Sequence, residues 1–497
     1  MFDEKHVPER KTPMNILPLL VNLVKDFNNA YADLVETPEK FPEFEKFVRQ
    51  LSLNFAAKLI SLALTDMNKL ICENSKRKER FIKQRTRLIT LISSVGDITF
   101  EHTLFLDKQE KRHRCLLDEI LQLPNREKLT SYGEALMLSE AAVYSYQHAA
   151  DVVGIGAAKV SKTTVMNKVH DIEEELPEPE TAPAEKKKCP VLYIEADEDH
   201  IHRQKDKEHE GCMIGKLAYV FEGKEDLCDG RRKLINPHYF AGLYEGSAQN
   251  QQFWDGVERF IEDHYDMDSL EQVYLISDGG AWIQTGVQTL YKCTAVIDKF
   301  HVVKYINRVC RLAGDEEKTY KENFYRAIYK NRLSAVQGLI NEIGAMHPGD
   351  EKVGAKLNEG LRYLENNWKA IHLAYANKDI PGSSTEGHVS TVLSDRMSSR
   401  PMGWSEAGSD RMCKLRCYIR NYGEDKVIDL VKARRLKECQ EEYAATGTDD
   451  IVLTAPERSF SKAQREAFRY VECLQVSLDP SCSVRKALAI RTHLSGI

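Results

Sequence analysis

The order of apolar and polar residues divides the chain into helical and strand-like stretches. In residues 14–72 the spacing is helical, because apolar side chains recur every three or four residues and form one stripe. The clearest stripe consists of Phe44, Phe47, Val48, Leu51, Phe55 and Leu59. We therefore expect residues 1–130 to be an N-terminal helical region.

Residues 131–172 are predicted to contain two short helices separated by glycines. The first spans Ser145–Val153, the turn carries Gly154 and Gly156, and the second begins at Ser161, a residue type that caps helices. A helix-turn-helix has this form, and so has any pair of helices joined by a glycine turn. In a DNA-binding helix-turn-helix, the second helix would present five polar side chains to the major groove: Lys162, Thr163, Thr164, Asn167 and Lys168.

An acidic, proline-rich stretch follows at residues 173–190 and predicts an extended linker. Strand-like runs come next, namely VLYIEAD, GCMIGKLAYVFEG, QVYLISDGG and TAVIDKF, with helical spacing between them. Residues 302–380 are helical in pattern, and helices continue after PGSS at Pro381. This succession predicts an α/β or α+β domain that begins near Val191.

The composition is that of a soluble globular protein, since 42% of the 497 residues are hydrophobic and 29% are charged. The apolar run that starts at Ile16 is nine residues long and includes a proline. It falls short of the roughly 20 residues that a membrane span needs, which predicts a cytoplasmic protein. The net charge of −6 argues against a uniformly basic DNA-binding protein. The basic stretch Ser75–Arg87 is either a solvated surface or a local patch that neutralises phosphates.

The stretch YIEADEDHIHR, from Tyr193, carries the first candidate chemistry. Because side chains alternate along a strand, Glu195, Asp197 and Asp199 share one face. Carboxylates on one face repel one another unless cations or water separate them. The cluster is therefore either a site for a divalent metal or a strand end in solvent.

Two further acids follow it. Asp278 is the first polar break after the apolar strand, and Gly279 and Gly280 leave room for a ligand at the backbone, although an ordinary Asp-Gly turn has the same sequence. Glu386 either completes a capping box with Ser383 or leads an apolar stripe that faces the core. Three carboxylates from two strands and a helix can hold two Mg²⁺ or Mn²⁺ ions roughly 4 Å apart, which is a site for phosphodiester chemistry.

Taken in order, these pieces resemble a bacterial insertion-sequence transposase of the DDE type, in a group related to the Mutator-like elements. The similar segments are YIEADEDHIHRQ, LISDGGAWIQTG, AVIDKFHVVKYI and STEGHVSTVLSDRMSSRPMGWS. The resemblance implies an α/β, RNase H-like catalytic domain in two parts, residues 191–301 and 381–425. An all-helical insertion at residues 302–380 separates the parts, and a helical C-terminal tail occupies residues 426–497.

The resemblance also implies catalytic roles. Asp197, Asp278 and Glu386 would be the catalytic and metal-binding acids, with Glu195 and Asp199 as rivals for the first position. Two Mg²⁺ or Mn²⁺ ions are the expected cofactors.

Other residues are matched less specifically. His301 would lie near the scissile phosphate, although a histidine at a strand-to-helix turn also commonly bonds the backbone. Arg396 and Arg400 are candidates for contacts with DNA phosphates, and many such arginines only cover a surface.

The expected partner is double-stranded DNA, both the element's terminal repeats and the target, and synapsis of two ends requires at least a dimer. Two other functions stay open. Asp197 and Asp199 also form the D-x-D that follows a core strand in phosphohydrolases of the haloacid dehalogenase type. The third possibility is a transposase derivative that binds DNA without catalysis.

Overall fold

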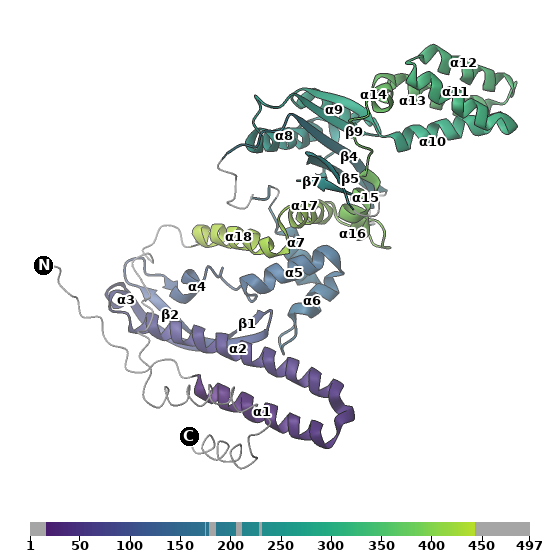
Figure 1. Cartoon of the computed structure of the whole chain (residues 1–497). Coiled ribbons are helices and arrows are strands. Elements are labelled where there is room, and N and C mark those ends of the chain that lie inside the picture. The colour runs from purple at the N-terminus through teal and green to yellow at the C-terminus, as the bar shows by residue number, and fades with distance from the viewer. Residues whose placement is uncertain (1–15, 174, 178–184, 205–210, 228–230, 443–497) are drawn as a thin grey trace. The chain divides into compact units, whose positions relative to one another are not determined.

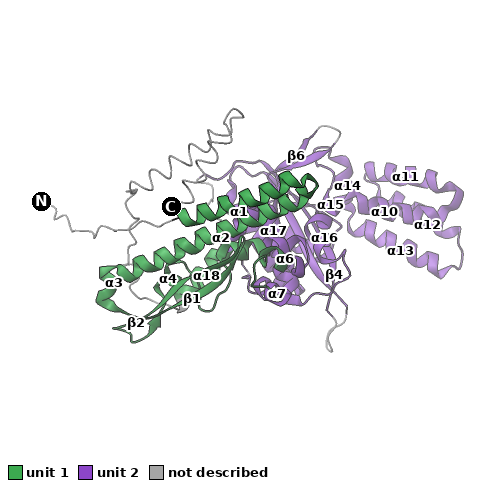
Figure 2. Cartoon of the chain, turned by 90° about the horizontal axis from the view of Figure 1, so that it is seen from below, with its two compact units in different colours: residues 1–137, 150–161, 431–497 green, residues 138–149, 162–430 purple. Residues whose placement is uncertain are grey.

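The computed structural model describes residues 16–173, 175–177, 185–204, 211–227 and 231–442, and these form two compact units (Figures 1 and 2). Unit 1 consists of the described residues within 1–137, 150–161 and 431–497, and unit 2 of those within 138–149 and 162–430. Residues 174 and 178–184 of the predicted linker, and the tail beyond residue 442, lie outside the described residues.

Unit 1 contains two long helices that pack on each other and a three-stranded antiparallel sheet in the order β1-β2-β3. Its first elements are α1 (Leu17–Glu36), α2 (Phe41–Glu73), α3 (Ser75–Arg80), β1 (Phe81–Ser93), β2 (Gly96–Asp107), β3 (His113–Arg114) and α4 (Leu116–Ile120). Residues 81–107, which the sequence analysis placed in a helical region, therefore form a β-hairpin. The reason is local, because β1 is rich in β-branched residues and Gly96 turns the chain with a φ of 113°.

The predicted helix pair is present, and its second helix is anchored in unit 2. The helices here are α5 (Ser131–Val143), α6 (Tyr146–Val153) and α7 (Lys162–His170). Val165 and Val169 of α7 are buried, and this helix packs on α17 (Glu406–Tyr422). The final described helix is α18 (Val427–Glu442).

The centre of unit 2 is a five-stranded mixed sheet in the order β10-β9-β4-β5-β8. Its strands are β4 (Val191–His202), β5 (Cys212–Phe221), β8 (His238–Leu243), β9 (Gln272–Ser277) and β10 (Cys293–Ile297). β9 pairs in parallel with both β4 and β10, whereas β5 is antiparallel to β4 and β8. A small ribbon of β6 (Gly223–Asp226) and β7 (Arg232–Ile235) lies between β5 and β8 in sequence.

The two faces of this sheet have different coverings. Leu192, Ile194 and Ala196 of β4 belong to a buried core with side chains of α8 (Gly246–His264) and α9 (Ala281–Thr289). The opposite face is covered by α15 (Thr385–Val389) and by α17, which packs on β8 and β5. Alternation therefore sends Leu192, Ile194 and Ala196 of β4 to one layer and Glu195, Asp197 and Asp199 to the other.

A helical block interrupts the domain where the sequence predicts an insertion. It comprises α10 (Lys299–Cys310), η3 (Arg311–Glu316), α11 (Glu317–Tyr329), α12 (Leu333–Ala345), α13 (Glu351–Asn366) and α14 (Trp368–Ala376). The block has its own buried core, and α14 packs against β10. The chain then returns to the sheet through α15, a π-helical turn at Ser390–Ser394 and α16 (Asp395–Met397).

Candidate active site

Asp197 and Asp278 lie at the same level on two neighbouring parallel strands. The register pairs Glu195 of β4 with Ile276 of β9, and Asp197 and Asp278 each come two residues further along. Asp278 follows the last residue of β9, and both aspartates are partly exposed. The carboxyl ends of adjacent parallel strands are a favoured position for active sites in open sheets.

The charge state of Asp197 reflects this neighbourhood. Burial, first, and the nearby Asp278 carboxylate raise the pKa of its carboxyl to about 6, against opposing effects of the Glu198 N–H and of His301. The N–H of Glu198 donates to Asp197 Oδ1 over 2.8 Å. A carboxylate pair that is partly desolvated and of like charge is electrostatically unfavourable until a cation joins it.

The backbone after β9 is shaped by glycine. Asp278 Oδ1 accepts the N–H of Gly280 over 2.8 Å, which closes a tight turn before α9. Gly279 has a φ of 90°, and a Cβ there would lie 2.6 Å from Asn367 Oδ1. Only glycine therefore suits this position, which lies beside the helical block.

His301 stands on the first turn of α10, directly beyond β10. Asp298 caps this helix, since its side chain accepts the N–H of Phe300 over 2.9 Å and its own N–H donates to Ser277 O of β9 over 2.7 Å. His301 acts electrostatically on Asp197 and opposes the rise in the pKa of that carboxyl. Asp298 is thus the orienting residue of this turn.

Glu195 has a structural role, which argues against its being the first metal-binding acid in place of Asp197. It is fully buried, and its Oε1 pairs with Lys224 Nζ at 2.7 Å. Its Oε2 accepts the N–H of Ser384 at 2.8 Å, the hydroxyl of Thr385 at 3.1 Å and the hydroxyl of Tyr219. With both oxygens occupied, Glu195 fastens the start of α15 to β4.

Asp199, the other rival, is also engaged. Ser398 donates its hydroxyl to Asp199 Oδ2 over 2.8 Å. The segment from Ser384 to Ser398 is thus bonded to β4 at two points, on either side of Asp197. Asp197 lies between these bonds on the same face, without a side-chain donor from that segment among the described bonds.

Glu386 is brought to this face but remains exposed on α15. The capping box with Ser383 does not form among the described hydrogen bonds, because Ser384 is the cap residue and Ser383 Oγ accepts the N–H of Thr385 over 3.2 Å instead. The stripe that follows is buried as predicted: Val389, Leu393 and Met397. Glu386 does not share their burial, and the carboxylates of Asp197, Asp278 and Glu386 do not all lie within 4.8 Å of one another.

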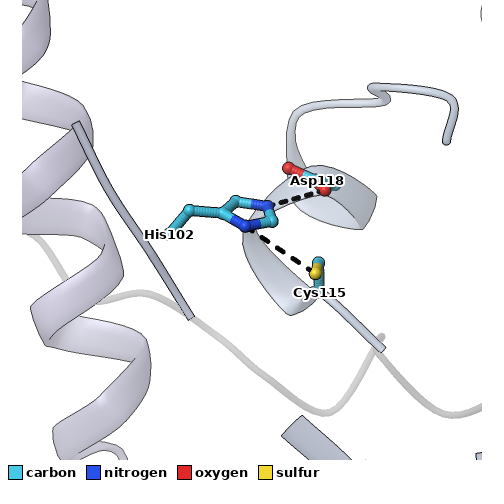
Figure 3. A group of neighbouring side chains, drawn as sticks. All are labelled: His102, Cys115 and Asp118. Carbon is cyan, nitrogen blue, oxygen red and sulfur yellow. Dashed lines mark hydrogen bonds and ion pairs between the residues drawn. The ribbon is translucent and has the colours of Figure 1, made fainter. Parts of the chain in front are cut away.

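Among the described residues, the group that does have three possible ligand atoms within 4.8 Å of one another lies in unit 1 and consists of His102, Cys115 and Asp118 (Figure 3). His102 Nε2 lies 2.8 Å from Asp118 Oδ2, and Cys115 Sγ lies 3.9 Å from His102 Nδ1. Burial and, second, Asp118 raise the pKa of Cys115 to about 12, so the thiol is neutral. Because the two partners use opposite ring nitrogens, the group is a hydrogen-bonded chain that joins β2 to α4.

The predicted DNA-binding residues divide into exposed and engaged side chains. Lys162, Thr163 and Asn167 of α7 are exposed, whereas Thr164 and Lys168 are partly buried. Arg396 is 2% exposed, and its guanidinium lies over Trp404 and donates to Ala141 O. Arg400 donates to Val143 O over 3.0 Å.

Arg396 and Arg400 therefore both satisfy carbonyls at the end of α5, Arg396 from a buried position and Arg400 from a partly exposed one. Arg416 of α17 bonds Ala142 O, the carbonyl between the two that Arg396 and Arg400 bond. Nothing in the sequence identified the hydrogen bonds and the ion pair made by Arg416, Lys224 and Tyr219, because each joins residues that lie far apart along the chain.

The fold and this site define a mixed α/β protein with two carboxylates on adjacent parallel strands, one inside β4 and one directly after the end of β9. Residues 36–470 match UPF0236, an uncharacterised protein family, and the chain belongs to that family. A UPF0236 protein of Caldanaerobacter subterraneus subsp. tengcongensis is 29% identical over 421 residues, which cover 85% of this chain and 86% of that protein. A second from the same strain is 29% identical with the same coverage. The names of these two proteins join eleven and four loci of that strain.

A structural similarity was found to a Drosophila P element transposase strand transfer complex. It has 12% sequence identity, a TM-score of 0.19, and coverage of 63% of this chain and 80% of that one. A score this low carries no argument about fold or function. In the described part of the chain, one helical stretch, Pro38–Glu73, is long and apolar enough to cross a membrane, and a single such stretch is weak evidence for a membrane protein.

Proposed function

We propose that this protein is a DDE-type DNA transposase of an insertion sequence, which uses Mg²⁺ or Mn²⁺ to cleave DNA phosphodiester bonds and transfer strands. The observation that carries the proposal is that Asp197, inside β4, stands level with Asp278, directly after the end of the parallel strand β9, together with the raised pKa of Asp197. Perturbed carboxyl pairs of this kind are typical of functional sites.

The sheet supports an RNase H-like assignment for the catalytic domain. In chain order the five strands take the spatial order 3-2-1-4-5, and only the second runs antiparallel to the others. An RNase H-like domain has this order. The helical block enters after β10 and ends before α15, where the resemblance to DDE transposases places an insertion.

The relatives supply an independent line of support. The name of one relative joins eleven loci of a single strain, and the name of another joins four. Their genes are therefore present in several copies. An element that copies or moves itself within a genome produces such families. The gene of a housekeeping hydrolase seldom occurs in so many copies.

The donor set suits two hard divalent ions. Asp197 and Asp278 supply carboxylate oxygens from the sheet, and Glu386 would supply the third carboxylate from α15. Bound there, the ions would activate the attacking oxygen and stabilise the leaving oxygen of each displacement at phosphorus. Glu195 holds α15 on β4, and His301 acts electrostatically on Asp197, where an imidazolium would favour the ionised carboxylate.

DNA would be held in part by the exposed polar side chains of α7, namely Lys162, Thr163 and Asn167. In this proposal the protein works in the cytoplasm as at least a dimer, because two element ends must be synapsed. Arg396 and Arg400 are left out of the DNA contacts, since both cap α5.

The phosphohydrolase alternative gains no support from the strand geometry. In that reading Asp199 would act from a loop after the strand. Here β4 continues to His202 while paired with antiparallel β5, and Asp199 is bonded to Ser398 within it.

A cleavage assay tests the proposal. The substrates are duplexes that carry the genomic DNA flanking the gene on each side, with Mg²⁺ or with EDTA. We expect metal-dependent nicking by the wild type and a loss of about 10³-fold in D278A, the upper range for removal of one electrostatic group. D199A, which removes an acid from the same strand face, should retain cleavage. Cleavage retained in D278A would overturn the assignment.

A further inference from the structure

The edge strand β1 exposes an unusual run of side chains. Every residue from Ile82 to Leu88 is exposed, and β1 has a neighbour, β2, on one side only. Three cations stand along this strand: Lys83, Arg85 and Arg87. They belong to the basic stretch whose role the sequence left undecided.

More cations flank the strand. Phe81 pairs with Asp107, and the N–H of Lys108 donates to Arg80 O over 3.0 Å, so the turn after β2 lies beside the start of β1. The exposed cations of α3 and of this turn are Lys76, Lys78, Lys108, Lys111 and Arg112. We call these five, together with Lys83, Arg85 and Arg87, the basic edge.

Two acids of this region, Asp107 and Glu110, are paired with other arginines. Asp107 pairs with Arg80 at 2.8 Å and with Arg114 at 3.5 Å, and Glu110 pairs with Arg80 at 3.4 Å. Arg77 is buried and donates to the carbonyls of the α2 end. The basic stretch thus contains structural arginines as well as the basic edge.

None of the eight cations of the basic edge takes part in an ion pair among the described residues. Lys108 Nζ bonds only the carbonyls of Lys78 and Glu79, which leaves its charge unneutralised. Such a concentration is notable in a chain with a net charge of −6. Charged side chains on β1 itself also protect an edge strand from pairing with other chains, but that role does not account for the cations of α3 and of the turn after β2.

We infer that the basic edge binds the phosphate backbone of duplex DNA. It supplies unpaired guanidinium and ammonium groups along an extended strand, which suits a row of phosphates rather than one bound anion. The surface belongs to unit 1 and is separate from α7. The choice of DNA rests on the proposed function, and the charge distribution on which the surface rests does not.

The test is the salt dependence of binding to a random-sequence 30-base-pair duplex, measured by fluorescence anisotropy with the full-length protein. The variant K83Q/R85Q/R87Q removes three cations of the basic edge. Since each lost phosphate contact lowers the log–log salt slope by about 0.9, the slope should fall by about 2 to 3. The matched control, K352Q/K356Q/R362Q, removes three exposed cations of α13 and should keep the wild-type slope.

An unchanged slope in K83Q/R85Q/R87Q, or an equal fall in the control, would overturn the inference. All six positions are exposed, so circular dichroism should show both variants folded. D278N separates this result from the proposed function, because it should bind DNA with the wild-type slope while failing to cleave. If the wild type cleaves no DNA but the salt slope still falls in K83Q/R85Q/R87Q, the binding surface is supported and the proposed transposase function is refuted.

Discussion

Glu195 and Asp197 stand two residues apart on the same face of β4, yet their surroundings are opposite. Glu195 is fully buried with a lysine and several hydroxyl and amide donors on its carboxylate. Asp197 is partly exposed, faces a second carboxylate and has a raised pKa. The comparison separates an acid that the fold uses for its own stability from one that the fold tolerates at a cost, and such a cost is characteristic of functional sites.

The largest effect is expected from Glu195→Ala. The change leaves Lys224, whose side chain is 5% exposed, without its anion and frees the start of α15. Breaking a buried pair on one side should lower the free energy of unfolding by about 3–5 kcal/mol. Urea denaturation of E195A and of the milder E195Q measures this. A loss under about 1 kcal/mol in E195A would show that the clamp is dispensable.

Asp197→Asn should change the free energy of unfolding in the opposite direction from Glu195→Ala. It removes one of two like charges from a partly desolvated site, so at pH 7 without divalent metal the variant should be more stable than the wild type by about 1 kcal/mol. The same denaturation series tests this prediction. If D197N is destabilised as E195A is, the distinction between the two acids fails.

The pH dependence follows from the same difference. The folded pKa of Asp197, about 6, lies above its ordinary value of 3.8, so the folded state holds the proton more tightly than the unfolded chain. Its contribution to stability is therefore present below pH 4 and is lost as the pH rises towards 6. D197N should lack this component in metal-free unfolding curves between pH 4 and 7. Metal-dependent cleavage should show the reverse trend and fall as the pH drops through about 6.

Ser398→Ala should have the smallest effect. It removes the single hydroxyl that bonds Asp199, at the far side of Asp197 from Glu195. A loss of about 0.5–1.5 kcal/mol is expected, as for one hydrogen bond. Cleavage should persist, because Asp199 is not assigned to the metal site, and its abolition in S398A would return Asp199 to the contest.

The sequence predicted those features that depend on local pattern. Alternation along β4 separated Glu195, Asp197 and Asp199 from its apolar face, and the glycines after Asp278 marked a close backbone approach that Asn367 explains. The helical block and the helices on either side of Gly154 were also predicted. Strand order and residue spacing carry this information without reference to distant contacts.

The features that it missed depend on distant partners or on competing patterns. The β1–β2 hairpin was hidden by charged residues that give β1 no apolar alternation. The carbonyl of Ala141 in α5 decides the role of Arg396, and Ser384 decides that of Glu195, each far along the chain. Alternation could place three acids on one face, but only the register with β9 identified Asp197 as the partner of Asp278.

The central claim is that Asp197 and Asp278 form a metal site which Asp199 does not share. Titration calorimetry of Mn²⁺ into the protein in complex with duplex DNA at pH 7.5 tests it most directly, with D197N and D199N compared with the wild type. We predict that D197N loses measurable Mn²⁺ binding and that D199N retains it. Wild-type Mn²⁺ affinity in D197N would contradict the account.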